Sequence, residues 1–173
     1  MKTRNLLVIA LVVLSGVVSV PARAAGPVCQ KVSGKLFEIP IDTFVSPGDP
    51  FGRTVVTIQG VVNGIGTGIL TSVGPGLTPG TLGATTRHVF VTGVGDQLVA
   101  TGSAVLTPIP NTPNVTDVVT FTITGGLGKY AGARGTIVAT GIGLNFFPLP
   151  PGPSAANNSS FEFQLDGELC GIR

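Results

Sequence analysis

The 173-residue chain has few charged residues and few of the side chains that enzymes use for catalysis. Asp, Glu, Lys and Arg together make up 10% of it, and it contains one histidine, one tyrosine and no tryptophan. A single histidine with no carboxylate or thiolate nearby in sequence does not make a metal site. The chain also has no Gly-x-Ser-x-Gly segment of a serine hydrolase. Its glycine-rich segment 64–68 lacks the Lys-Ser/Thr end of a phosphate loop. We therefore expect neither a metal nor a cofactor.

The N-terminus carries a targeting pattern. Lys2 and Arg4 precede an apolar run from Leu6 to Val20, which is short for a membrane span. Ala22-Arg23-Ala24 then supplies the small residues that precede a cleavage site. This order is typical of a secretory signal peptide, which we assign to residues 1–24.

Cleavage would leave residues 25–173, a length that fits one domain. This part has seven basic and eight acidic residues, so its net charge is about −1 and no basic patch indicates a nucleic-acid partner. No second long apolar run follows the leader. We therefore expect a secreted or periplasmic protein with no membrane insertion after signal cleavage.

The mature part reads as an all-β chain. Eight runs have strand character and are bounded by Gly, Pro, Asn or Asp, and no stretch of ten or more residues free of Gly and Pro keeps a helical period. Evenly spaced short strands favour a sandwich or a barrel. The eight predicted strands cover approximately residues 30–41, 53–62, 64–73, 84–93, 97–106, 115–124, 134–146 and 159–170.

Several of these runs alternate clearly. In the last run, Phe161, Phe163 and Leu165 alternate with acidic or amide residues, as a half-buried antiparallel strand requires. The run at 134–146 instead has Ala139, Gly141 and Gly143 on one face. Such a face leaves room either for a ligand or for large side chains opposite.

The stretch from Phe121 to Gly135 is the most distinctive part of the chain. An alternating strand runs into Gly125, Gly126 and Gly128, which predict a tight turn because glycine adopts positive φ freely. Residues 125–135 read Gly-Gly-Leu-Gly-Lys-Tyr-Ala-Gly-Ala-Arg-Gly. This segment resembles the Gly-Gly-x-Gly-(Lys/Arg)-(Tyr/Phe)-x-x-Ala-Arg-Gly hallmark of plant dirigent proteins, and the related allene oxide cyclases carry a similar turn.

The resemblance implies an eight-stranded antiparallel β-barrel with an apolar cavity, of the allene oxide cyclase and dirigent type. It also implies a homotrimer and a small apolar ligand, with a cyclase, isomerase or dirigent-like role that needs no cofactor. Leu36-Phe37-Glu38-Ile39 resembles the first cyclase strand, whose Glu assists ring closure, and Arg134 matches the arginine of the hallmark. Glu38 and Arg134 are therefore the predicted catalytic residues.

The chain also departs from both families. Pro40 stands where the cyclases have Asn, and no cysteine lies in the barrel wall between Cys29 and Cys170. Phe51-Gly52-Arg53 resembles a dirigent strand, but Ile58 and Gln59 stand where that strand continues into paired aspartates. A non-enzymatic structural or interaction protein that keeps the fold is therefore the alternative hypothesis.

Each candidate residue also has a structural interpretation. Glu38 is either an acid–base group inside the barrel or an exposed strand residue, and Arg134 either enters the cavity or satisfies carbonyls of the glycine turn. Four further polar residues are predicted to bind the ligand, although His88 also fits a structural role and Tyr130 a packing role. These four are Gln59, His88, Lys129 and Tyr130.

The two cysteines lie near the two ends of the mature chain. Exported proteins form disulfides readily, and the first and last strands of a closed barrel are neighbours. A Cys29–Cys170 bridge would close a loop of about 140 residues and contribute about 4–5 kcal/mol in the chain-entropy model. The rival interpretation is a catalytic or metal-binding pair.

Overall fold

The computed structural model describes residues 28–41, 52–146 and 159–172, which form eight strands and one 3₁₀ turn. The predicted signal peptide lies outside these described residues. The elements are β1 (Cys29–Pro40), β2 (Arg53–Gly60), β3 (Gly64–Pro75), β4 (Leu82–Gly93), β5 (Asp96–Pro108), β6 (Val115–Leu127), η1 (Gly128–Tyr130), β7 (Arg134–Leu144) and β8 (Ser160–Cys170).

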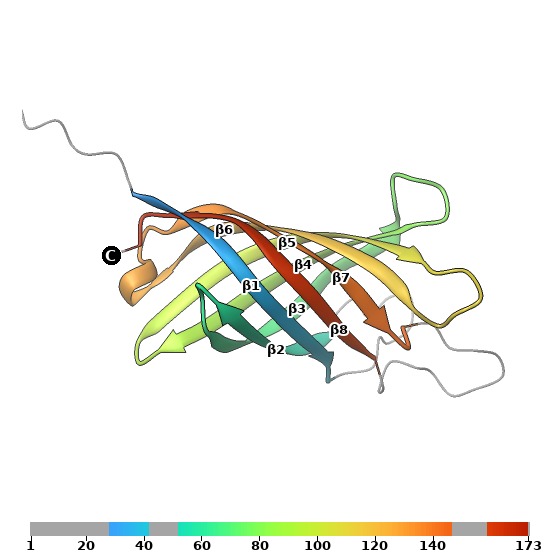
Figure 1. Ribbon diagram of the computed structural model, residues 1–173, viewed down its shortest axis with the longest axis horizontal. Helices are drawn as coiled ribbons and strands as arrows, with labels where there is room; N and C mark the ends of the chain where they lie inside the picture. The colour runs from blue at the N-terminus through green and yellow to red at the C-terminus, as the bar shows by residue number, and fades with distance from the viewer. Residues whose placement is uncertain (1–27, 42–51, 147–158, 173) are drawn as a thin grey trace, which may run out of the picture.

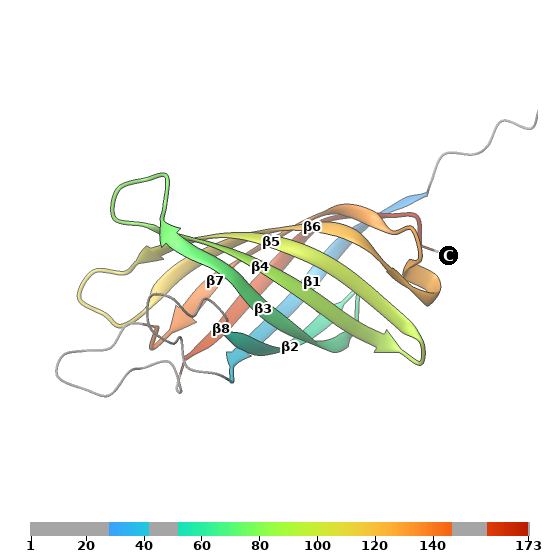
Figure 2. The same cartoon turned by 180° about the vertical axis from the view of Figure 1, so that it is seen from behind.

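The strands close into an antiparallel barrel in sequence order (Figure 1). Each strand pairs with the next along the chain, and β1 pairs with β8 from Cys29↔Cys170 to Glu38↔Phe161. The view from behind shows β3, β4 and β5 crossing the opposite wall (Figure 2). The predicted fold class is therefore confirmed, and the barrel rather than the sandwich is the correct alternative. Closure leaves no free edge among the eight described strands for another chain to extend.

Alternation along the strands separates the interior from the surface. On β8, Phe161, Phe163 and Leu165 are buried, and the residues between them are exposed. On β7 the small residues face inward, with Ala139 buried, whereas Val138 is exposed. The room left by the small face of β7 is taken up by its neighbours, because a Cβ added at Gly141 or Gly143 would meet the ring of Phe163 or Phe161.

The two ends of the barrel differ in their filling. At the end where β1 begins and β8 ends, buried side chains pack across the interior, among them Val32, Leu98, Tyr130 and Leu169. Tyr130 belongs to η1, which lies at this end (Figure 1). At the other end, where β1 ends and β8 begins, the interior opens into a cavity.

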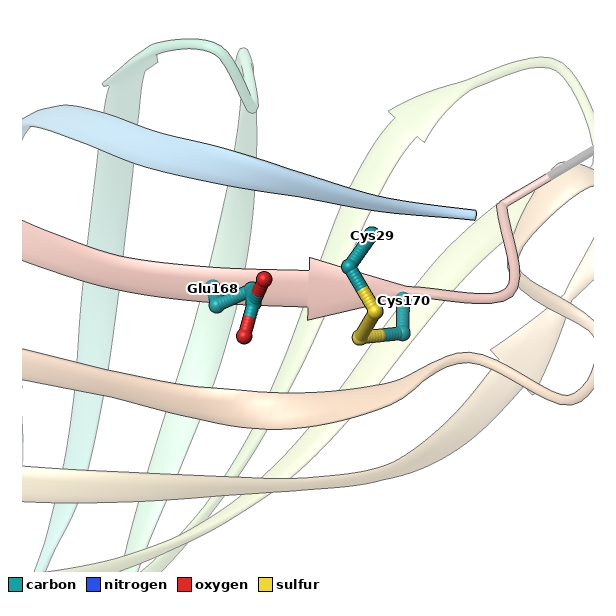
Figure 3. Close-up of side chains that lie close together, drawn as sticks. All are labelled: Cys29, Glu168 and Cys170. Atoms are coloured by element: carbon teal, nitrogen blue, oxygen red, sulfur yellow. A yellow bond between two sulfur atoms is a disulfide. The ribbon is translucent and has the colours of Figure 1, made fainter. Parts of the chain in front are cut away.

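A disulfide joins the first and last strands at the filled end (Figure 3). Cys29 and Cys170 are direct register partners, and their sulfurs are bonded over a sequence separation of 141 residues. This confirms the predicted bridge. The Glu168 carboxylate lies close by, but the two sulfurs are not available as thiolate metal ligands while they are bonded to each other. The bridge is typical of an oxidising compartment.

The glycine-rich stretch has a different shape from a simple turn. β6 runs on to Leu127, so Gly125 and Gly126 belong to the strand, and the turn itself begins at Gly128. Gly125 and Gly128 adopt φ values of 136° and 61°, which favour glycine. The register between β5 and β6 shifts next to Gly125, so the first glycine accommodates a strand irregularity and the third opens η1.

Candidate functional site

The open end of the barrel holds a cavity of about 110 Å³. An eight-stranded barrel has an interior wide enough to hold one small ligand. Most of the lining is apolar and comes from inward-facing residues near the ends of the strands. The larger apolar lining residues include Leu70, Leu82, Leu106, Val119, Phe121, Phe146 and Phe161.

A polar cluster formed by Glu38, Thr54 and His88 lies in one side of this lining. The Thr54 hydroxyl donates a hydrogen bond to Glu38 Oε1, and His88 Nε2 lies 3.4 Å from the same oxygen. The three residues come from β1, β2 and β4. Glu38 is thus held inside the barrel by two donors, which is the geometry expected for a carboxylate that accepts hydrogen bonds.

Gly68 makes this cluster possible. It lies on β3 between β2 and β4, paired with Thr54 on one side and His88 on the other. A Cβ at this position would meet the Thr54 hydroxyl and would lie 2.6 Å from His88 Nε2. The missing side chain therefore leaves the space in which His88 reaches Glu38.

His88 is fixed by aromatic neighbours. Its side chain is 1% exposed, stacks on Phe90 at 5.7 Å between ring centroids and meets Phe121 edge-on at 5.0 Å. Its Nδ1 atom is buried and has no hydrogen-bond partner among the described residues. The ring is therefore oriented by packing, with one nitrogen directed at Glu38.

Asp117, on β6, is a second carboxyl group in the cavity lining, and it is buried. The pKa of Asp117 is raised to about 7, chiefly by burial and also by the negative charge of Glu38, while a hydrogen bond from the Val118 backbone opposes the rise. Asp117 Oδ1 is buried without a hydrogen-bond partner in the described chain. Two carboxyl groups in different environments therefore share one cavity, an arrangement that enzymes use to separate acid and base roles.

Sequence reasoning missed Asp117, although a signal was present. In the run 115–124, Asp117 falls on the same face as Val115, Val119 and Phe121. A lone acidic residue on an apolar strand face is an unusual buried polar group and so a candidate site residue. Thr54 and Gly68 gave no comparable signal, because their roles depend on contacts across strands.

The structure places two of the predicted site residues in the cavity, Glu38 and His88. Arg134 is exposed at the start of β7, where it pairs with Cys170, whereas Glu38 pairs with Phe161 at the other end of β8. The structure therefore does not bring Glu38 and Arg134 together.

The remaining predicted residues also lie away from the cavity. Gln59 is exposed near the end of β2. Lys129 Nζ lies 3.7 Å from Asp96 Oδ2 and 5.1 Å from the Tyr130 ring centroid, and the Lys129 backbone N–H donates to Asp96 Oδ1. Tyr130 itself is buried in the core. This group holds η1 against the β4–β5 hairpin, which is a structural arrangement at the filled end of the barrel.

Comparisons with known proteins found no match: no family model, no curated protein and no solved structure is similar to this chain at a significant level. Among the described residues there is no helix long and apolar enough to cross a membrane. The chain is thus placed at the level of its fold, as an all-β protein built on an eight-stranded antiparallel closed barrel with a polar cluster in an apolar end cavity.

Proposed function

We propose that the protein binds a small, largely apolar molecule in the end cavity and that Glu38 is the group that acts on it. The observation that carries this proposal is the position of the Glu38 carboxylate, which is held by Thr54 and His88 within a mostly apolar lining. Pockets of this composition, with few polar groups and many apolar ones, are the usual form of small-molecule sites.

The volume sets the size of the occupant. A cavity of about 110 Å³ is close to engineered cavities of about 150 Å³ that bind benzene. The cavity therefore suits a single ring or the end of a longer apolar molecule that enters from the open end.

The chemistry we propose is proton transfer without a cofactor, as in an isomerase or cyclase. A carboxylate in an apolar site accepts a proton from a bound molecule and returns it at a second atom, and a neighbouring imidazole supports this by donating a hydrogen bond. Export to the periplasm or the medium is part of the proposal, and the disulfide supports it.

A second candidate function is a structural or interaction role without catalysis. Its support is the apolar outer surface of β1, β2 and β3, where neighbouring exposed side chains include Phe37, Ile39, Val55, Ile65 and Ile69. Scattered exposed apolar residues are normal, but a group on adjacent strands is typical of a contact surface. A homotrimer remains the proposed assembly.

The first experiment is native mass spectrometry of the protein purified from its own host, followed by unfolding and identification of any released compound. A stoichiometric small apolar compound is expected. The matched variants are Ala104→Leu, which fills the cavity, and Ser103→Leu, which adds the same side chain on the exposed face of β5. Loss of the compound in the first variant alone supports the proposal. An empty protein, or equal loss in both variants, contradicts it and favours the structural role.

A further inference from the structure

This inference deepens the proposed function and rests on it. We propose that the cavity selects apolar molecules that carry one carbonyl oxygen and that Asp117 donates the hydrogen bond that holds this oxygen. Glu38 and Asp117 then have different tasks, since Glu38 accepts protons and Asp117 recognises the ligand.

The geometry of Asp117 carries the argument. The residue is 5% exposed and lines the cavity, and its Oδ1 atom has no partner in the described chain. Its register partners are Leu106 on β5 and Gly141 on β7, and neither side chain offers a polar atom. Buried polar atoms are almost always hydrogen-bonded, so the partner that this oxygen lacks is best supplied from within the cavity.

The charges around Asp117 decide whether it donates or accepts. Among the described lining residues, the ionisable groups that share the cavity with it are Glu38, Arg53 and His88, while β5 and β7 contribute none. Glu38 already has donors in Thr54 and His88, so it serves as the acceptor. Asp117 Oδ1 has no donor among the described residues, and the pKa of Asp117 is raised to about 7 by burial and by Glu38. Below neutral pH it therefore carries a proton that it can donate.

A second buried polar atom without a hydrogen-bond partner supports the inference that the ligand carries an oxygen. Thr86 Oγ1 lies in the same lining and is also buried without a partner among the described residues. A hydroxyl group can donate to a carbonyl oxygen, so Thr86 offers a second unsatisfied donor in the lining. A purely apolar ligand would leave both groups without a hydrogen-bond partner.

The rival ligand class is an apolar amine, which an ionised Asp117 would hold as a cation. The two classes predict opposite pH dependence. A carbonyl compound loses its donor as pH rises through the pKa of Asp117, whereas an ammonium group gains its counter-charge. Asp117→Asn separates them further, because the amide still donates a hydrogen bond but carries no charge.

The experiment uses three probes of equal heavy-atom number: cyclohexanone, methylcyclohexane and cyclohexylamine. Their affinities for the mature, disulfide-bonded protein are measured by ligand-observed NMR at pH 5.5 and pH 8.5. The variants are Asp117→Asn and Asp117→Leu, the second of which keeps a similar shape and removes the donor.

We expect cyclohexanone to bind the wild type about three- to tenfold more weakly at pH 8.5, the range that one hydrogen bond supplies. Asp117→Leu should weaken cyclohexanone binding by the same factor at pH 5.5 and should not weaken methylcyclohexane binding. Asp117→Asn should keep cyclohexanone binding and remove its pH dependence.

Three results would overturn the inference. Equal response of cyclohexanone and methylcyclohexane to Asp117→Leu would show that Asp117 does not recognise the oxygen, and the proposed function would stand. Cyclohexylamine binding that strengthens with pH and is lost in Asp117→Asn would make the site a cation site. Absence of binding by all three probes at both pH values would count against the proposed function as well.

Discussion

Glu38 on β1 and His88 on β4 lie 3.4 Å apart, Oε1 to Nε2, although two further strands separate them in the sheet. The contact crosses the barrel interior above Gly68 on β3, which has no side chain to fill the intervening space. A single glycine thus decides whether the carboxylate and the imidazole form one site. This relationship gives the first prediction.

Gly68→Ala should destabilise the protein by about 1–3 kcal/mol, the usual cost of overpacking an interior. The added Cβ would collide with the Thr54 hydroxyl and with His88 Nε2, so the hydrogen bonds to Glu38 should be lost as well. Urea unfolding measures the stability. Gly74→Ala on the same strand is the control, since a Cβ there meets no atom within 4 Å. Equal effects of the two variants would contradict the prediction.

The fold was accessible from sequence because strand periodicity is local. Turn residues and alternating apolar positions mark all eight strands to within a few residues. Periodicity alone left the choice between sandwich and barrel open, and the resemblance of residues 125–135 to known barrel families decided it. Closure depends on the pairing of β1 with β8, which joins residues more than a hundred positions apart.

The site was less accessible because it depends on which strand face is inside. On β1, Phe37 and Ile39 are exposed and Glu38 faces the cavity. Because both faces of β1 carry apolar side chains, the sequence pattern does not indicate which face points into the barrel. Arg134 lies on the same face of β7 as Val138, which is exposed. The alternation of the strand already placed these two residues on one face. The resemblance of the motif implied a catalytic role for Arg134, but its position on the exposed face of β7 does not support that role.

Arg134→Ala should leave ligand binding unchanged, whereas Glu38→Gln should weaken it. Arg134 pairs with Cys170 and Glu38 with Phe161, so about nine residues of β8 separate their levels. At about 3.3 Å per residue this is about 30 Å, beyond the reach of a side chain. The measurement is the amount of compound released on unfolding of each variant. Loss of the compound in Arg134→Ala would restore the role that the family resemblance implies.

Removal of the disulfide should lower the free energy of unfolding by about 5 kcal/mol without changing the cavity. The chain-entropy model gives this value for a loop of about 140 residues, and the bridge spans 141 positions. Cys29→Ser/Cys170→Ser is compared with the oxidised wild type by chemical unfolding and by probe binding. A stable double variant would show that the β1–β8 hydrogen bonds hold the closure by themselves. Weaker probe binding in a variant that is still folded would contradict the prediction, because it would show that the disulfide at one end of the barrel affects the cavity at the other end.

The stability of the protein should fall between about pH 4 and pH 7 through Asp117. In the unfolded chain the pKa of this group is 3.8, and in the fold it is about 7. The unfolded state therefore releases its proton first as pH rises, while the folded state retains it, which favours unfolding. The stabilisation is fully present below pH 4 and is lost once pH exceeds the folded pKa.

The size of this effect follows from the same two pKa values. At about 1.4 kcal/mol per pH unit, the contribution lost is about 4 kcal/mol at most. Asp117→Asn cannot ionise, so the difference in unfolding free energy between variant and wild type should grow from pH 4 to pH 7 and then level off. Urea unfolding at several pH values measures this difference, which also cancels the contributions of the other carboxylates. A difference that stays constant with pH would show that Asp117 is ionised in the folded protein, and the proposed hydrogen bond to a ligand carbonyl would lose its donor.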